Sequence, residues 1–404
     1  MTEDKLRILL VNPFDKIPGE EFRDQRYTIL FLELQKKHEV KWISSDFNHW
    51  LHKKRDPHMI PDTFRNKIVL IPTIPYYNNI SIIRYISHLF LSLNTYFYIK
   101  KLKFKPDIIL CVGPVELNYL ISKYSNRNNI RLIIDILDLW PDLFFNIIPK
   151  YLSFLKKIIS LPFIKISELS LKYAHEVTAV SRTYMEWAIK RSGRSDFENF
   201  SFFYLGNNSY SKSYNINKNR ILLRCLFAGQ FGFNYDIETI VEVAIRFNKE
   251  GINDIEFILA GDGYKKKKVL NLIRGLKNIK ILNWINYKKL QLIGYHCHIG
   301  LNCYIKNATQ SVPTKLFDYM SMGLFIVNSL RGEASELIYN YKIGVNYEAE
   351  NTDSLYLCLN NLRTNIDSVI EGGKKSLEIF KRNFTLELVS QKMINELILK
   401  KNVK

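Results

Sequence analysis

A short stretch of the chain, residues 306–338, carries side chains and spacing that suit the binding of an anion. Pro313 breaks the segment before it, and the run from Thr314 to Met322 has apolar residues at helical spacing and stops at Gly323. The first amides of such a helix have no partner within the helix, and the helix dipole places partial positive charge beside them. Because Lys315 adds an ammonium group in the first turn, this helix start suits a diphosphate.

One carboxylate of the same helix suits a neighbouring group of such a ligand. Asp318 lies one turn into the predicted helix, where its two oxygens can accept hydrogen bonds from a pair of ribose hydroxyls. The alternative is that Asp318 only complements the positive end of the helix dipole.

The elements that must position these residues alternate between strand and helix. Short β-branched runs separated by amphipathic helical stretches predict strands at 7–13, 39–44, 67–71, 107–112, 131–136 and 176–181, and again at 224–230, 255–263, 279–285, 298–304 and 324–329. This order predicts an α/β protein with two doubly wound, Rossmann-like parallel-sheet domains. Ligands bind at the carboxyl ends of such strands, so we expect the site in a cleft between two facing domains.

The length of 404 residues agrees with two domains. A Ser/Asn-rich interval predicts the boundary, because a solvated linker is where few contacts cross between domains. We expect an N-terminal domain over 1–206, a linker over 207–220 and a C-terminal domain over 221–384. We also expect a C-terminal helix within 385–404 that packs back on the N-terminal domain.

The five cysteines are scattered and form no CxxC pair. They indicate reduced thiols in the cytoplasm rather than a disulfide framework. The run HCHIGLNC at 296–303 offers a metal-site alternative, but its alternating apolar residues favour a buried strand. We therefore expect no metal.

The net charge of +19 calls for an acidic partner or surface. Basic residues mix with aromatic and aliphatic ones at 94–105 and 149–165, a pattern typical of a helix that lies on an anionic membrane. The alternative is that these lysines only solvate the surface. No nucleic-acid recognition motif is present, so we expect no nucleic-acid partner.

Several segments in this order resemble the retaining GT-B glycosyltransferases of family 4, in particular the bacterial branch that builds O-antigen, capsule and exopolysaccharide. They are PGEEFRDQRY at 18–27, HEVKWISSDFNH at 38–49, DLWPD at 138–142, HEVTAVS at 175–181, LFAGQFGFNYDIETI at 226–240 and LAGDG at 259–263. The resemblance implies transfer of a sugar, with retention and no cofactor, from a nucleotide-sugar donor to a polyprenyl-diphosphate-linked glycan acceptor. It also implies a cytoplasmic protein that lies peripherally on the inner face of the bacterial plasma membrane, whose inner leaflet is anionic.

The resemblance also places a donor site. The family's two glutamates, which have seven residues between them, fall on Gln310 and Asp318, and the usual Arg after a glycine is replaced by Gln230 after Gly229. Lys315 is then the nearest residue that can supply the missing positive charge to the diphosphate, and we expect it to be catalytic. The expected donor-binding residues are Gly229, Gln230, Gly261, Gln310, Val312, Pro313, Thr314, Lys315, Asp318 and Glu333.

On the acceptor side, we expect Arg23 and Arg26 on one helix face, facing an acceptor pyrophosphate, unless they are solvated surface residues. Asp138 is the expected catalytic group beside the acceptor hydroxyl, with a helix cap as its alternative. The other acceptor-side residues are Gly19, Asp46 and His49, of which the histidine has a structural role as its alternative.

Two other functions remain open. A nucleotide-sugar 2-epimerase shares the architecture but needs no lipid acceptor, so interconversion of a nucleotide-sugar without acceptor would identify it. A non-catalytic assembly partner would keep the fold and lose the chemistry, as the replacement of the first glutamate by Gln310 allows.

Overall fold

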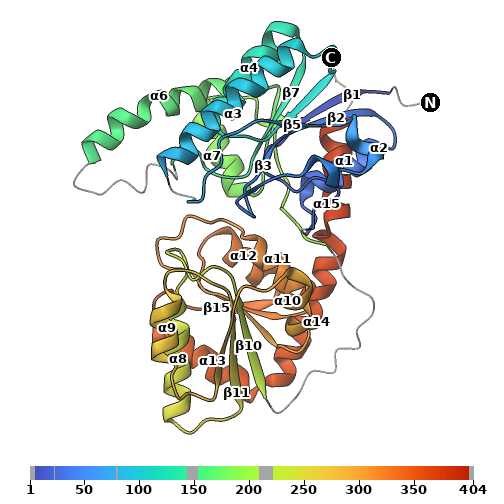
Figure 1. The fold of residues 1–404 in the computed structure, drawn as a ribbon. Helices are drawn as coiled ribbons and strands as arrows, with labels where there is room; N and C mark the ends of the chain where they lie inside the picture. The colour runs from blue at the N-terminus through green and yellow to red at the C-terminus, as the bar shows by residue number, and fades with distance from the viewer. Residues whose placement is uncertain (1–4, 22, 79–80, 143–152, 209–221, 400–404) are drawn as a thin grey trace. The chain divides into compact units, whose positions relative to one another are not determined.

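The computed structural model describes residues 5–21, 23–78, 81–142, 153–208 and 222–399, with 153–157 described by their backbone alone (Figure 1). The chain divides into two compact units. Unit 1 comprises Met1–Leu205 and Leu386–Lys404, and unit 2 comprises Gly206–Thr385. Most of the expected linker, from residue 209 on, and the start of the basic stretch 149–165 lie outside the described residues.

Unit 1 is built on a seven-stranded parallel sheet in the order β5-β2-β1-β6-β7-β8-β9. Its strands are β1 (Arg7–Val11), β2 (Glu39–Ser45), β5 (Ile68–Ile71), β6 (Ile108–Cys111), β7 (Arg131–Ile136), β8 (Glu176–Ala179) and β9 (Phe200–Phe202). Its described helices are α1 (Arg26–Leu34), α2 (Asp62–Arg65), α3 (Ile82–Lys101), α4 (Val115–Asn128), α6 (Ser153–Lys172), α7 (Arg182–Ser192) and α15 (Leu386–Met393). Central strands such as β6 are continuous apolar runs because both of their faces are covered.

Short elements complete this unit. The two-stranded antiparallel pair β3 (Phe47–Asn48) and β4 (Lys53–Lys54) follows β2, and the 3-10 turns are η1 (Pro57–Met59) and η3 (Phe197–Asn199). Helix α15 continues into a π-helical turn, η4 (Ile394–Ile398).

The C-terminal helix belongs to the core of unit 1. Val389, Met393 and Leu397 are buried in one apolar cluster with Tyr27 and Phe31 of α1. Figure 1 shows α15 beside α1. The chain therefore leaves unit 1 at residue 205 and returns to it at residue 386.

Unit 2 is built on a six-stranded parallel sheet in the order β12-β11-β10-β13-β14-β15. Its strands are β10 (Leu223–Ala228), β11 (Ile255–Ala260), β12 (Ile279–Leu282), β13 (Ile299–Asn302), β14 (Phe325–Asn328) and β15 (Gly344–Asn346). Its helices are α8 (Ile237–Lys249), α9 (Lys266–Leu272), α10 (Tyr287–Gly294), α11 (Thr314–Ser321), α12 (Glu333–Tyr341), α13 (Thr352–Thr364) and α14 (Ile366–Asn383). Several of these helices begin at a side-chain cap, as Asp236 does for α8 by accepting from the Thr239 amide.

The predicted fold class is confirmed: the protein has two parallel α/β sheets in a GT-B-like arrangement of elements. Each of the eleven expected strands is present, although most are shorter than expected. The sequence analysis missed β9, β15 and the β3–β4 pair, which have two or three residues each and so carry too few positions for a periodic pattern.

Candidate active site

The predicted anion-binding helix of unit 2 lies at the point where the strand order of the sheet reverses. Strand β10 lies between β11, which follows it in the chain, and β13, which does not. Loops after β10 and β13 therefore run in opposite directions and leave a crevice at their carboxyl ends, where doubly wound sheets bind ligands. Gly229 follows β10, and the loop that leads to α11 follows β13.

Lys315 is the central side chain of this crevice. It is only 8% exposed, and its Nζ lies 3.9 Å from the ring centre of Tyr235 and 4.1 Å from that of Phe227. This buried Nζ has no hydrogen-bond partner among the described residues. Burial lowers the pKa of Lys315 to about 7, while the nearby Cys303 and Asp318 act in the opposite direction. An anion that entered the crevice would supply the missing partner and favour the protonated amine.

Two glycines allow close packing beside this lysine. A Cβ on Gly229 would lie 2.7 Å from Lys315 Nζ, so a larger residue would occupy the space in front of the amine. A Cβ on Gly261, in the loop after β11, would lie 1.9 Å from the carbonyl oxygen of Gly229. The backbone amide of Phe231 also donates to Asp262 O at 2.8 Å, so the loops after β10 and β11 are held together.

The loop before α11 is fixed by a carboxylate. Ser311 Oγ donates to Glu333 Oε2 at 2.9 Å, and Glu333, the first residue of α12, is 4% exposed. Glu333 therefore positions the loop that carries Val312 and Pro313, in addition to any contact with a ligand. The side-chain oxygen of Gln310, in the same loop, is buried and has no hydrogen-bond partner among the described residues.

Helix α11 begins where the sequence predicted, at Thr314, with Pro313 at its N-cap. Asp318 is partly buried and accepts a hydrogen bond of 2.6 Å from Asn207 Nδ2 at its Oδ1. The same amide group contacts the hydroxyl of Tyr287. The structure thus brings together Gly229, Gly261, Lys315 and Asp318 at one edge of the unit 2 sheet, whereas Gln230 is exposed on the loop after β10.

Unit 1 has its own pocket, at the corresponding reversal between β1 and β6. Residues from the loops after β1, β6 and β7, from the β3–β4 hairpin and from helices α3, α6 and α7 line it. Two of the predicted residues, His49 and Asp138, lie in this lining.

The pocket wall is aromatic and contains neutral imidazoles beside one guanidinium. His49 Nδ1 lies 2.7 Å from the hydroxyl of Tyr76, and burial together with the charge of Arg84 lowers the pKa of His49 to about 3. The same two causes lower the pKa of His88 to about 3. Arg84 lies over the ring of Trp140 at 5.3 Å. Flat apolar rings with a few polar groups are typical of sites that bind small ligands.

Asp138 has solvent-accessible surface at the pocket, but its carboxyl group is closely surrounded by protein atoms. This desolvation raises the pKa of Asp138, and the charge of Arg84 and a hydrogen bond from Trp140 partly oppose the shift. Since it lines the pocket as a carboxylate of raised basicity, Asp138 is a fitting proton acceptor for a bound hydroxyl.

The prediction that Arg23 and Arg26 lie on one helix face was wrong. Helix α1 begins at Arg26, so Arg23 precedes it and the two do not share a helix face. Arg26 is 2% exposed, forms an ion pair with Asp135 and donates to the carbonyl oxygen of Phe203 at 2.7 Å. A buried guanidinium that is engaged in this way binds no acceptor.

Gly19 and Asp46, which were expected on the acceptor side, contact other parts of unit 1. A Cβ on Gly19 would lie 1.8 Å from Met59 O, so the space beside it is filled by η1. Asp46 accepts from the Thr73 amide at 2.8 Å. Neither residue lines the pocket.

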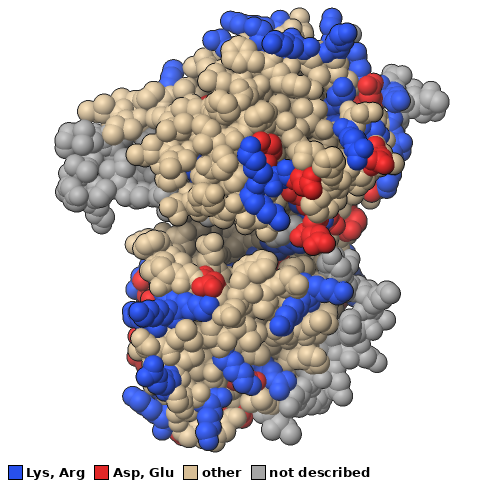
Figure 2. Space-filling model, viewed as in Figure 1, with Lys and Arg blue, Asp and Glu red and all other residues tan. Residues whose placement is uncertain are grey.

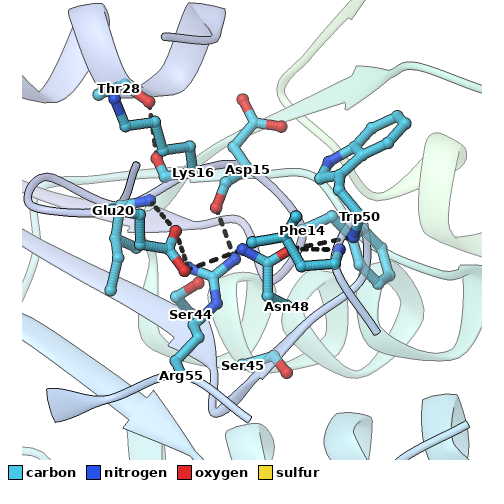
Figure 3. Close-up of polar contacts among 12 residues, drawn as sticks. Phe14, Asp15, Lys16, Glu20, Thr28, Ser44, Ser45, Asn48, Trp50 and Arg55 are labelled. Atoms are coloured by element: carbon cyan, nitrogen blue, oxygen red, sulfur yellow. Dashed lines mark hydrogen bonds and ion pairs between the residues drawn. The ribbon is translucent and has the colours of Figure 1, made fainter. Parts of the chain in front are cut away.

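A buried polar network explains the shape of the Gly19 loop (Figure 3). Arg55, 6% exposed, donates to Asp15 O at 2.8 Å and forms an ion pair with Glu20 at 3.3 Å. Asn48 Nδ2 donates to Glu20 Oε1 at 2.9 Å. The network ties the loop after β1 to the β3–β4 hairpin, and this hairpin in turn carries His49.

Sequence reasoning missed two groups of site residues. Arg84 and His88 of α3 line the pocket, and their only signal was that they interrupt an otherwise apolar stretch. Phe227 and Tyr235 surround Lys315, and nothing in their spacing indicated it.

Residues 223–365 match the family model of the glycosyl transferases group 1. No curated protein matches the chain by sequence.

Solved structures resemble the chain over nearly its whole length. HepE from Anabaena, solved with UDP, has a TM-score of 0.69 at 13% identity over 98% of this chain and 100% of its own. Sucrose-phosphate synthase from Thermosynechococcus elongatus has a TM-score of 0.71 at 11% identity over 97% and 98%. WaaG, a glycosyltransferase involved in lipopolysaccharide biosynthesis, has a TM-score of 0.62 at 9% identity over 96% and 99%.

At these identities the structural likeness establishes the fold, and the family match covers the sheet of unit 2 that holds Gly229 and Lys315. Residues 223–365 therefore match the group 1 glycosyl transferases, and the chain as a whole has the GT-B fold.

Proposed function

We propose that the protein transfers a sugar, with retention, from a nucleoside diphosphate sugar to a polyprenyl-diphosphate-linked glycan during synthesis of a bacterial surface polysaccharide. The observation that carries the donor part is the buried Lys315, whose Nζ has no hydrogen-bond partner among the described residues and lies against Gly229 at the start of α11. HepE, which shares the fold, has been solved with UDP and with UDP-glucose.

In this proposal the donor diphosphate binds in front of Gly229. Lys315 and the first amides of α11 stabilise the negative charge that develops on the leaving diphosphate. Asp318, held by Asn207, accepts hydrogen bonds from the ribose. Gln310 and Glu333 lie toward the donor sugar, and Gly261 keeps the Gly229 loop in place.

The acceptor part rests on the pocket of unit 1. Its aromatic wall suits the apolar face of a sugar ring, and Arg84 suits an anionic group of the acceptor. Asp138 takes the proton of the attacking hydroxyl in this scheme. The basic and aromatic stretches of the chain, together with the role printed for WaaG, support a lipid-linked acceptor at the inner face of the plasma membrane.

The test compares Lys315→Ala and Asp318→Ala with Lys267→Ala, an exposed lysine of unit 2. Affinity for UDP, measured by calorimetry, and transfer from UDP-glucose or another UDP-sugar are expected to fall by at least about tenfold in the first two variants, since each loses a charged contact. The Lys267→Ala variant is expected to match the unmodified protein. Unchanged UDP affinity and turnover in both site variants would refute the donor-site assignment.

A further inference from the structure

Helix α3 presents two chemically different faces. One face places His88 in the pocket and buries Leu91 and Ile99 in the core of unit 1. The other face exposes large apolar side chains, each between 42% and 76% exposed: Ile82, Ile83, Ile86, Phe90, Leu93 and Phe97. From Ile83 on, steps of three and four residues place them along one side of the helix, and we call the six residues the α3 stripe.

Helix α6 extends this apolar surface. Ile158, Ile159 and Leu161 are exposed by 48% to 62%. The rings of Tyr85 and Phe163 lie 5.4 Å apart and join α3 to α6. Figure 2 shows the side of unit 1 that carries these two helices as a wide area with few charged side chains. Contiguous apolar surface of this kind marks a place where a protein contacts a partner or a membrane.

The charges around the α3 stripe indicate which partner it fits. No Asp or Glu occurs between Ile82 and Lys105. Exposed lysines gather at the end of α3 and just after it, at 100, 101, 103 and 105. An anionic lipid surface offers both an apolar layer and negative head groups, whereas a second copy of the same face would bring lysines against lysines.

We propose that the α3 stripe, together with the exposed apolar residues of α6, is the surface that docks on an anionic membrane. The helix lies in the plane of the head groups, with the stripe toward the acyl chains and the lysines against lipid phosphates. None of the helices in the described part of the chain is long and apolar enough to span a bilayer.

This inference rests on the proposed function, which places the acceptor in a membrane, and it assigns the docking to particular residues. The sequence had pointed to 94–105 and 149–165. Ile99 and Phe104 of the first stretch are buried, and the exposed stripe begins twelve residues before that stretch, at Ile82. Because the other side of α3 carries Arg84 and His88, docking by the stripe places the pocket of unit 1 close to the lipid head groups. A diphosphate near the head-group region then lies within reach of Arg84.

The test measures co-sedimentation of the full chain with vesicles. One set contains equimolar phosphatidylcholine and phosphatidylglycerol, and the other contains phosphatidylcholine alone. The double variant Ile86→Glu/Phe90→Glu is expected to lower the affinity for the anionic vesicles by at least about tenfold. The matched control is Leu357→Glu on α13, since Leu357 is 63% exposed and lies in unit 2. It is expected to bind as the unmodified protein does.

A second variant separates charge from apolar contact. Lys100→Gln/Lys101→Gln is expected to weaken binding to the anionic vesicles by about thirtyfold, because each of the two lysines near such a surface contributes about 1 kcal/mol. Added salt is expected to remove this difference.

Three results would overturn the proposal: absence of vesicle binding by the unmodified protein, unchanged binding by the Ile86→Glu/Phe90→Glu variant, and a dimer in sedimentation velocity that this variant dissociates. UDP affinity is measured on the same samples. Since the donor residues lie in unit 2, loss of vesicle binding with intact UDP affinity separates a failure of docking from a failure of the proposed donor site.

Discussion

Replacing Lys315 by methionine is expected to stabilise the unliganded protein while it abolishes binding of the donor. Methionine has a similar length and fits among Phe227 and Tyr235 without a charge. The unmodified protein buries an amine whose Nζ has no hydrogen-bond partner in the described part of the chain, which disfavours the folded state wherever the unfolded chain is protonated.

The size of the effect follows from the pKa. The pKa of Lys315 falls from 10.5 to about 7 on folding because of burial. At 1.36 kcal/mol per pH unit, the proton lost on folding costs about 4 kcal/mol at neutral pH. Attraction between the amine and the two rings offsets about 1 to 2 kcal/mol of this cost. The Lys315→Met variant should therefore gain about 2 to 3 kcal/mol, or about 5 to 10 °C in Tm.

The gain should depend on pH. Between the folded and unfolded pKa values, the unfolded chain holds a proton that the folded chain has released, so the stability of the unmodified protein rises with pH across that range. The difference between the two proteins is expected to shrink to about 1 kcal/mol near pH 10, where the amine is neutral in the folded chain and has begun to lose its proton in the unfolded chain as well.

The assay is thermal unfolding of both proteins at neutral pH and near pH 10, with and without UDP, and with Lys267→Met as an exposed control. UDP is expected to raise the Tm of the unmodified protein and of the control, and to leave that of Lys315→Met unchanged. A Lys315→Met variant that is less stable than the unmodified protein at every pH would contradict this prediction, because it would show that the lysine stabilises the fold and does not wait for a ligand.

Two further predictions concern unit 1. Asp138→Asn is expected to lower sugar transfer by at least about a hundredfold with UDP affinity unchanged. Because desolvation raises the pKa of Asp138, the unmodified enzyme should lose activity on acidification at a higher pH than it would with an ordinary aspartate. A pH–rate profile without this loss on the acidic side would contradict the role of Asp138. Asp135→Asn leaves Arg26 charged in the core and is expected to lower the free energy of unfolding by about 3 to 5 kcal/mol. Urea unfolding measures this free energy, and a decrease below about 1 kcal/mol would show that the Arg26–Asp135 pair is solvated.

The fold could be predicted from the sequence because its strands are buried on both faces. Segments such as CLFA at 225–228 and FILA at 257–260 are continuous apolar runs that are typical of a parallel sheet. The β3–β4 pair could not be predicted in this way. It is held by Arg55, whose partners Asp15 and Glu20 lie 40 and 35 positions away in the chain, and local periodicity contains no information about such contacts.

The candidate site was predictable where a single helix creates it. Lys315 and Asp318 follow from the helix that starts after Pro313, and the structure brings both to the crevice of unit 2. Arg26 failed because its surroundings depend on Asp135, which lies on a central strand more than a hundred residues away. The sequence indicated an accessible charge, either beside an acceptor or in solvent, and only the fold shows that it is buried.

The return of the chain to unit 1 has a consequence for biosynthesis. Helix α15 covers Tyr27 and Phe31, but roughly 180 residues of unit 2 separate it from the rest of that core. At about 5 to 20 residues per second, the ribosome needs about 10 to 35 seconds to make them. During that interval the nascent first unit exposes the apolar surface that α15 will cover. The synthesis of α15 therefore sets the time at which the new protein no longer exposes this apolar surface to chaperones.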